Sequence, residues 1–227
     1  MNNVSDKIYT TLCVVFSLFI VVGNLIYQKF VFLPILPFHI FELSVGAITY
    51  PLTFMLTDLI AEFYGKNKAN FCVRLAIVMN IIIALVIMMM DKLNATEWSK
   101  IDNITFHRVF GLYSVAFIGS IIACYIAQLF DITIYLWIRK LTGSRWLWLR
   151  NNGSTAISLF IDTCIVINFM SMFGILPIDR LWPLIINSYL FKLFFTVCST
   201  PLFYACVGII RWLLKNETKR SNFTFSD

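Results

Sequence analysis

The sequence predicts an all-α integral membrane protein, a polytopic bundle of six transmembrane helices. Of its 227 residues, 59% are hydrophobic and only 13% are charged, and the mean hydropathy is +0.82. Soluble domains carry about 25% charged residues, so this composition excludes a soluble fold. A membrane-spanning helix needs about 20 apolar residues. The apolar runs allow six such helices in a single domain and leave no room for a separate soluble module.

The first two spans are separated by a segment that contains two prolines. The first span is expected at about residues 8–27, and we interpret it as retained because no convincing cleavage site of small residues follows it. After it, Pro34 and Pro37 disfavour a continuous helix, since proline lacks the N–H group that a helix needs. We expect an interfacial or re-entrant segment there. The second span, at about 43–64, should end at Gly65, which is followed by cationic residues.

The remaining elements follow the same apolar pattern. The third span is expected at about 71–90, and a hydrophilic segment separates it from the fourth span at about 106–130. Within the fourth span, Gly119, Ala123 and Ala127 repeat at every fourth residue. Such a ridge of small residues lets a neighbouring helix approach closely. The last elements are spans at about 152–175 and 184–214 and a polar tail at 215–227.

Lysine and arginine residues are divided unequally between the two sides of the predicted bundle. Twelve lie on the side that carries both termini and five on the other side. Because cytoplasmic loops of membrane proteins are rich in Lys and Arg, both termini are expected in the cytoplasm. This topology also explains the net charge of +6. The lipid bilayer is therefore the expected environment, and no nucleic-acid partner is expected.

Asp58 and Glu62 stand out because they lie four residues apart inside a predicted span. One helical turn separates them, so both carboxylates project from the same face. A charge in the bilayer is costly, and such residues usually face a bundle interior or a polar cavity. Two carboxylates this close in a low dielectric are expected to share a proton at neutral pH. The alternative is that Lys66 or Arg74 neutralises Glu62 and leaves Asp58 to bind or pack.

Further polar residues line the later spans. Gln128 and Asp131 share one face of the fourth span. Arg150 precedes a polar line in the fifth span that runs through Asn151, Ser154, Ser158 and Asp162.

Lys192 lies within the sixth span, and a lone lysine in hydrocarbon requires an anionic partner. Asp162 is the most economical partner, because both residues are expected at mid-depth on neighbouring antiparallel helices. Such a buried pair can be purely structural. It can equally belong to a binding site.

The sequence lacks the motifs of membrane enzymes and metalloproteins. Its six cysteines are scattered through apolar segments without a C-x-x-C pair, which disfavours a zinc site or a disulfide framework. No H-E-x-x-H, G-x-S-x-G or glycine-rich phosphate loop occurs. We therefore expect no enzymatic activity, no metal and no cofactor. Acids, a lysine and stripes of hydroxyl and amide groups instead fit a cavity for a small polar solute.

Three strings carry a resemblance to a known family: PLTFMLTDLIAEFYGK, QLFDITIYLWIRKLTGSRWLWLRNNGSTAISLFIDT and SYLFKLFF. With their T-D-L-x-x-E-x-Y-G and R-N-N-x-S-T-x(6)-D patterns, they resemble the queuosine precursor transporter family over roughly residues 43 to 205. The resemblance implies a six-helix inner-membrane importer of 7-deazaguanine bases, such as 7-cyano- or 7-aminomethyl-7-deazaguanine or queuine, that are used in tRNA modification. It also implies a set of functional residues. They are Asp58, Glu62, Gln128, Asp131, Arg139, Arg150, Asn151, Ser154 and Asp162, to which the buried position of Lys192 adds a tenth candidate.

The chemistry of a guanine-like base agrees with these residue types. Its adjacent N1–H and 2-amino donors form a parallel pair that one carboxylate can accept. Gln128 or Asn151 can read O6, and aromatic rings can stack on the flat faces of the base.

Two other functions stay open at this point. The small size also resembles substrate-binding subunits of energy-coupling-factor vitamin transporters, although the first span lacks the A-x-x-x-A docking face of those subunits. A membrane enzyme or assembly factor is the third possibility. The sequence leaves open which base is carried, how transport is energised and whether the chain forms a homo-oligomer.

Overall fold

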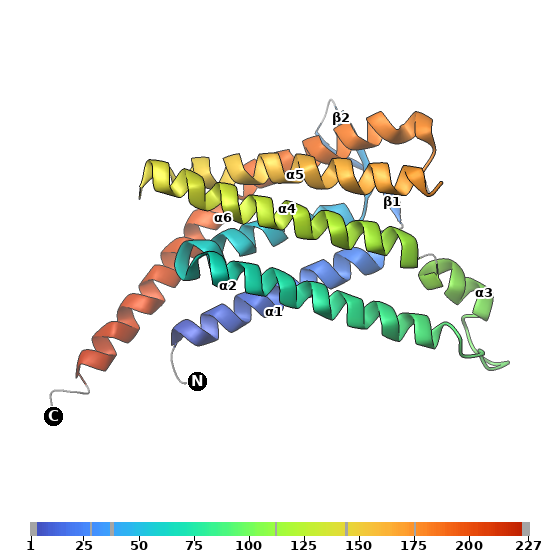
Figure 1. The fold of residues 1–227 in the computed structure, drawn as a ribbon, viewed down its shortest axis with the longest axis horizontal. Helices are drawn as coiled ribbons and strands as arrows, with labels where there is room; N and C mark the ends of the chain where they lie inside the picture. The colour runs from blue at the N-terminus through green and yellow to red at the C-terminus, as the bar shows by residue number, and fades with distance from the viewer. Residues whose placement is uncertain are drawn as a thin grey trace.

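Long helices make up most of the structure. The computed structural model describes residues 4–27, 29–36, 39–111, 113–143, 145–174 and 176–223. Pro37 and the last four residues of the expected tail lie outside these ranges. The long helices are α1 (Val4–Ile26), α2 (Gly46–Met90), α4 (Tyr113–Thr142), α5 (Leu147–Met172) and α6 (Leu181–Phe223), drawn in Figure 1. The short elements are β1 (Phe30–Leu36), β2 (His39–Ser44), α3 (Asn103–Phe106), the π-helical turn η1 (His107–Gly111) and the 3-10 turn η2 (Ile178–Arg180).

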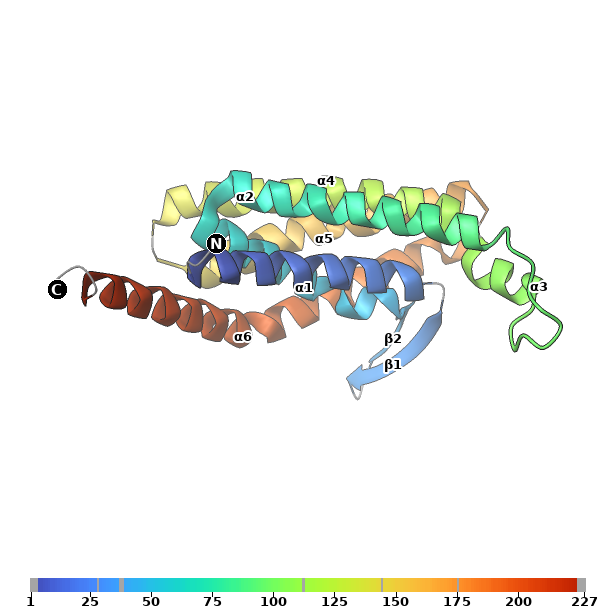
Figure 2. The same cartoon turned by 90° about the horizontal axis from the view of Figure 1, so that it is seen from below.

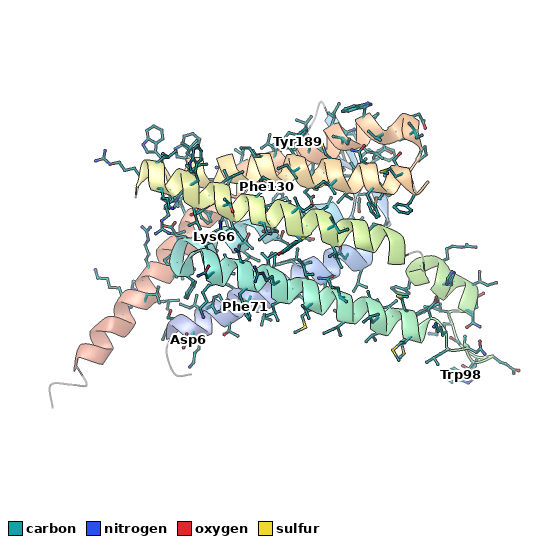
Figure 3. The ribbon with its side chains drawn as sticks, viewed as in Figure 1. Asp6, Lys66, Phe71, Trp98, Phe130 and Tyr189 are labelled. Carbon is teal, nitrogen blue, oxygen red and sulfur yellow. The ribbon has the colours of Figure 1, made fainter. Side chains whose placement is uncertain are left out.

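Five helical segments, one in each long helix, are long and apolar enough to cross a membrane. Their outer surfaces are apolar as well, and Phe71 and Phe130 project outward with more than half of their surface exposed (Figure 3). The buried side chains, in contrast, include many polar and charged ones. Polar groups inside and apolar groups outside are the arrangement that a lipid environment favours. The chain is a multi-pass membrane protein.

Helix α2 reverses direction at Gly65. Its 45 residues would span about 68 Å as one straight helix, more than twice the thickness of the hydrocarbon core. Gly65 has φ 78°, which glycine adopts without steric cost. The two halves of α2 run in opposite directions in both views (Figures 1 and 2).

Contacts with α1 confirm this reversal. Tyr64 and Lys68, on either side of Gly65, bond to residues at the start of α1. Further from Gly65, Gly46 contacts Gly23 and Asn80 bonds to Asn24. Gly23 and Asn24 both lie near the end of α1. Residues 46–64 and 66–90 therefore form a helical hairpin with Gly65 at its turn.

The segment between α1 and α2 forms a β-hairpin, not only the interfacial or re-entrant segment expected from its prolines. Strands β1 and β2 pair antiparallel, with Phe30 opposite Ser44, and the register shifts between Leu33 and Leu36. Pro34 lies at this irregularity, where its missing N–H group interrupts the pairing least. Phe41 and Leu43 are buried against Phe191 of α6. The hairpin thus covers one end of the bundle, and the all-α expectation requires this correction.

Helices α4 and α5 pack closely along the small-residue ridge. Ala123 and Ala127 are fully buried, and a Cβ atom on Gly119 would overlap the ring of Phe169. The expected ridge therefore serves packing. Helix α4 also continues beyond Phe130, the expected end of the fourth span, as far as Thr142. Hydropathy indicates where a helix leaves the apolar layer of the membrane, and α4 continues as a helix beyond that point.

Candidate functional site

The bundle has two distinct ends, and buried polar residues connect them. The hairpin end carries β1 and β2, and the arginine end carries Glu62 with Arg139, Arg150 and Arg211. The first residues of α1 and the last third of α6 both lie at the arginine end (Figure 1).

At the hairpin end lies a cavity of about 100 Å³, called here the hairpin-end cavity. All five long helices and both strands contribute to its walls. Its polar lining consists of Asn24, Tyr27, Ser44, Tyr50, Ser120, Asp162, Thr163, Ser188 and Lys192. Glycine and apolar residues of α1, β1, α2, α5 and α6, together with Leu176, line the remainder. A mostly apolar wall with a few convergent polar groups is typical of a small-molecule site.

Asp162 and Lys192 form an ion pair in this cavity, as the sequence analysis predicted. The Lys192 Nζ lies 2.8 Å from Asp162 Oδ2 and 3.2 Å from the hydroxyl of Thr163. Tyr50 donates its hydroxyl to the other carboxylate oxygen, Oδ1, at 2.8 Å, and its ring lies 4.7 Å beneath the ammonium group. Both carboxylate oxygens of Asp162 are therefore bonded. A solute that uses this carboxylate must displace Tyr50 or Lys192.

Asn24 and Asn80 bond to each other across helices. Asn24 donates to Asn80 Oδ1 at 3.1 Å, and the hydroxyl of Ser120 donates to Asn24 Oδ1 at 2.7 Å. Asn80 satisfies its own amide by donating to the Ala76 carbonyl. Because Asn24 and Ser120 also line the cavity, this group ties α1, α2 and α4 together at its wall.

A column of polar side chains leads from the cavity toward the arginine end. Thr57 donates to Gln128 Oε1 at 2.8 Å, and Gln128 donates to the hydroxyl of Thr53 at 3.3 Å. All three are fully buried. The column continues with Asp58 one residue further along α2.

Asp58 faces Asp131 of α4, and this acid pair is fully buried. Ser154, Thr155 and Ser158 of α5 lie beside Asp131. Within the described part of the chain, none of the four carboxyl oxygens has a partner in hydrogen-bond geometry. The same holds for the hydroxyl of Ser158 and the side-chain oxygen of Asn151. Unsatisfied buried polar atoms are rare and call for an explanation.

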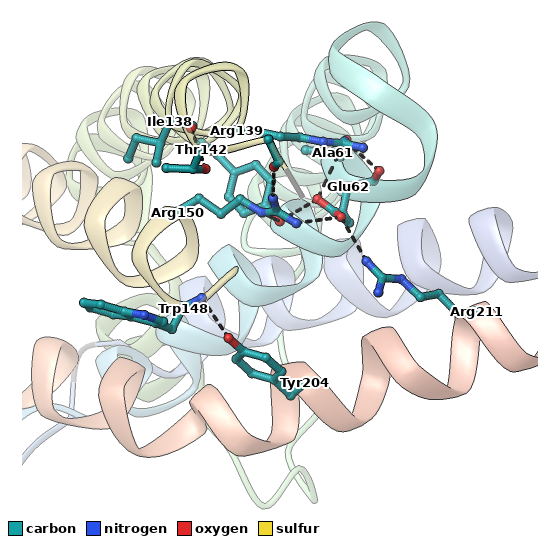
Figure 4. A network of polar contacts seen from close by, with 11 residues as sticks. Ala61, Glu62, Ile138, Arg139, Thr142, Trp148, Arg150, Tyr204 and Arg211 are labelled. Atoms are coloured by element: carbon teal, nitrogen blue, oxygen red, sulfur yellow. Dashed lines mark hydrogen bonds and ion pairs between the residues drawn. The ribbon is translucent and has the colours of Figure 1, made fainter. Parts of the chain in front are cut away.

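Glu62 occupies the centre of the arginine end (Figure 4). Arg150 lies 2.7 Å from Glu62 Oε1, Arg211 lies 3.5 Å from the same oxygen, and Arg139 lies 3.6 Å from Oε2. Tyr135 donates to Oε2 at 3.0 Å. These arginines border an open depression of about 830 Å³, called here the arginine-end depression. Glu62 is therefore neutralised by arginines of α4, α5 and α6, and neither Lys66 nor Arg74 takes this role among the recorded ion pairs of the described residues.

The structure distributes the ten predicted site residues over three levels. Asp162 and Lys192 line the hairpin-end cavity, while Glu62, Arg139 and Arg150 line the arginine-end depression. The other five lie on the buried faces of α2, α4 and α5 and line neither the cavity nor the depression; they are Asp58, Gln128, Asp131, Asn151 and Ser154. Asp58 and Glu62 share a helix face as expected, yet they meet different partners.

Sequence reasoning missed Tyr50, Tyr135 and Arg211. Tyr50 comes directly before the motif that begins at Pro51, and Tyr135 lies one helical turn after Asp131. Tyr135 therefore has the spacing that places it on the same helix face as a predicted site residue. Arg211 had been counted only as a topological charge at the end of the last span.

Comparison with known proteins agrees with the resemblance stated above. The family model described as "Putative vitamin uptake transporter" matches residues 44–206. A protein of Bacillus subtilis (strain 168) named "Probable queuosine precursor transporter" is 31% identical over 169 residues, covering 74% of this chain and 72% of that protein. No solved structure matches. Both relationships indicate a transporter of the membrane, and the chain belongs to the putative vitamin uptake transporter family.

Proposed function

We propose that this transporter imports queuosine precursors, that is, 7-deazaguanine bases such as 7-cyano- or 7-aminomethyl-7-deazaguanine or queuine, across the inner membrane for tRNA modification. The name of the Bacillus subtilis relative supports this substrate class. The observation that carries the proposal is the buried Asp162–Lys192 ion pair in the wall of the hairpin-end cavity. It supplies a charged acceptor and a charged donor in a mostly apolar site.

The topology that we propose has six crossings, with both termini in the cytoplasm. Each half of α2 is long enough to cross once, and α1, α4, α5 and α6 each cross once. An even number of crossings agrees with the start of α1 and the last third of α6 both lying at the arginine end (Figure 1). The excess of Lys and Arg on that side supports its assignment to the cytoplasm. The hairpin-end cavity then faces the incoming solute.

Recognition of the base begins at the ion pair. The N1–H and 2-amino donors of the base suit the Asp162 carboxylate once Tyr50 or Lys192 releases it. Lys192 can then donate to an acceptor such as O6. Tyr27, Phe30 and Tyr50 line the same cavity and provide rings for stacking, which contributes about 1–3 kcal/mol per base.

Transport requires a path from the cavity to the arginine-end depression. Along α2, Tyr50 lines the first and Glu62 lines the second, and a rise of twelve residue steps from one to the other corresponds to about 18 Å. The polar column of Thr53, Thr57 and Asp58 fills this distance. Such a closed middle between two openings fits alternating access, in which one opening forms as the other closes.

Uptake of labelled base tests this proposal. Cells that cannot synthesise queuosine precursors should accumulate labelled 7-cyano-7-deazaguanine when they express the chain. They should not accumulate it with an empty vector. Unlabelled queuine should compete, and an analogue without the 2-amino group should compete poorly. Absence of accumulation, with the protein present in the membrane, would contradict the proposal.

A further inference from the structure

The acid pair of Asp58 and Asp131 lacks a counter-charge. Both side chains are fully buried, and no described residue provides a hydrogen bond to their four carboxyl oxygens. Two ionised carboxylates in this position would repel each other and would each lack solvation. A buried charge without a partner is strongly unfavourable.

The cations closest to the acid pair are committed elsewhere. Arg150 of α5 bonds to Glu62 at 2.7 Å, to the Gly143 carbonyl at 2.9 Å and to the Tyr135 hydroxyl at 3.3 Å. Arg211 of α6 reaches Glu62. Tyr135, the other titratable group beside Asp58, also bonds to Glu62.

Glu62 itself lies one turn from Asp58 on α2 and adds negative charge to the same region. Lys192 is held by Asp162, as described above. The ion pair at the hairpin end is balanced one to one, and at the arginine end three arginines contact the single carboxylate of Glu62. None of the ion pairs among the described residues includes Asp58 or Asp131.

The surroundings of Asp131 offer further oxygen atoms. The hydroxyl of Ser158 is fully buried, lies beside Asp131 and has no partner among the described residues. It is an independent unsatisfied group next to the pair. A hydroxyl can donate to one carboxyl oxygen or accept from a protonated one.

We propose that Asp58 and Asp131 bind one proton between them at neutral pH. One shared proton reduces the charge of the pair to that of a single carboxylate and supplies the missing hydrogen-bond donor. The site joins α2 to α4, and it lies on the polar column between the hairpin-end cavity and the arginine-end depression. Loss of the proton would restore the repulsion and favour separation of the two helices.

This location gives the proton a role in transport. If the proton stabilises the closed middle of the bundle, then proton binding and solute passage influence each other, because coupling between two sites is reciprocal. This role rests on the proposed function. The binding of the proton does not.

Infrared spectroscopy of the purified full-length protein tests proton binding without any substrate. The wild type at neutral pH should show the C=O stretching band of a protonated carboxyl group, with the usual shift in heavy water. The band should disappear in Asp58→Asn and in Asp131→Asn. It should persist in Asp179→Asn, a matched control that removes a solvent-exposed carboxyl group.

Several outcomes would overturn the proposal. A wild-type protein without the band at neutral pH does so directly, even if the variants fail to fold. Persistence of the band in both folded variants does so too. A wild-type protein that lacks the band in sodium chloride and shows it only in choline chloride would identify sodium as the ion that occupies the site when both ions are available. A protein that shows the expected band and takes up no 7-deazaguanine would contradict only the proposed function.

Discussion

Two of the buried pairs in the bundle, Asp162 with Lys192 and Asp58 with Asp131, differ in how their charges are balanced. Asp162 at the hairpin end has a cation at 2.8 Å and a hydroxyl on its other oxygen. Asp58, about as deeply buried, faces another acid and has no hydrogen-bond partner among the described residues. The first pair is complete within the protein, while the second needs something from outside. The comparison separates a pair that stabilises the wall of the hairpin-end cavity from a pair that we propose to exchange a proton.

The largest expected effect comes from breaking the complete pair. Lys192→Met leaves Asp162 as a buried charge without its cation, which costs about 3–5 kcal/mol. The amount of protein in the membrane should fall sharply. The double variant Asp162→Asn with Lys192→Met removes both charges and should restore the amount, although uptake should remain absent. Normal amounts of the single variant would show that the pair does not stabilise the fold.

Removal of the tyrosine from the same pair should have an intermediate effect. Tyr50→Phe deletes the hydroxyl that donates to Asp162 Oδ1, and a hydrogen bond to a charged group contributes about 1.5–3 kcal/mol. The thermal unfolding midpoint in detergent should decrease. Tyr189→Phe is the control, because Tyr189 packs edge-on against Phe160 and is only partly buried. Equal midpoints for Tyr50→Phe and the wild type would contradict the assigned hydrogen bond.

The unbalanced pair should tolerate neutralisation. Asp58→Asn removes one of two repelling acids and keeps the size of the side chain, so stability should change by less than about 1 kcal/mol, within the range of one net hydrogen bond. Thermal unfolding measured beside Lys192→Met gives the comparison directly. If Asp58→Asn destabilises the protein as strongly as Lys192→Met, the two pairs do not differ as described.

The smallest effect is expected at the exposed edge of the arginine end. The side chain of Arg211 is 59% exposed and lies 3.5 Å from Glu62, so its ion pair should contribute between about 0 and 1 kcal/mol. Arg211→Gln should therefore leave the unfolding midpoint nearly unchanged. Arg150→Gln should lower it clearly, since Arg150 is buried and would leave Glu62 without its closest partner. Equal effects of the two variants would show that burial does not decide the strength of these contacts.

The sequence predicted an ion pair where one buried residue by itself requires a particular kind of partner. A lysine in an apolar helix requires an anion, and depth alone pointed to Asp162; the structure confirms this pair. The small-residue ridge of α4 was recognisable because its repeat of four residues is set by helix geometry.

The sequence could not reveal which helix each polar face meets. Spacing placed Asp58 and Glu62 on one face and suggested a proton shared between them. One helical turn, however, shifts Glu62 far enough along the bundle to reach Arg150, while Asp58 meets Asp131. The β-hairpin was missed for a similar reason, since Pro34 argues against a helix but strand pairing depends on the partner strand. Packing between distant segments decides both features.

Solute binding to the purified protein tests the central claim most directly, namely that the solute binds at Asp162 and Lys192 and the proton at Asp58 and Asp131. Calorimetric titration with 7-cyano-7-deazaguanine should show binding to the wild type and to Asp58→Asn, and no binding to the double variant Asp162→Asn with Lys192→Met. Release or uptake of protons on binding, measured in buffers of different ionisation enthalpy, should differ between the wild type and Asp58→Asn. Loss of binding in Asp58→Asn together with normal binding in the double variant would contradict the account, because the solute would then bind at the acid pair and not at the hairpin-end cavity.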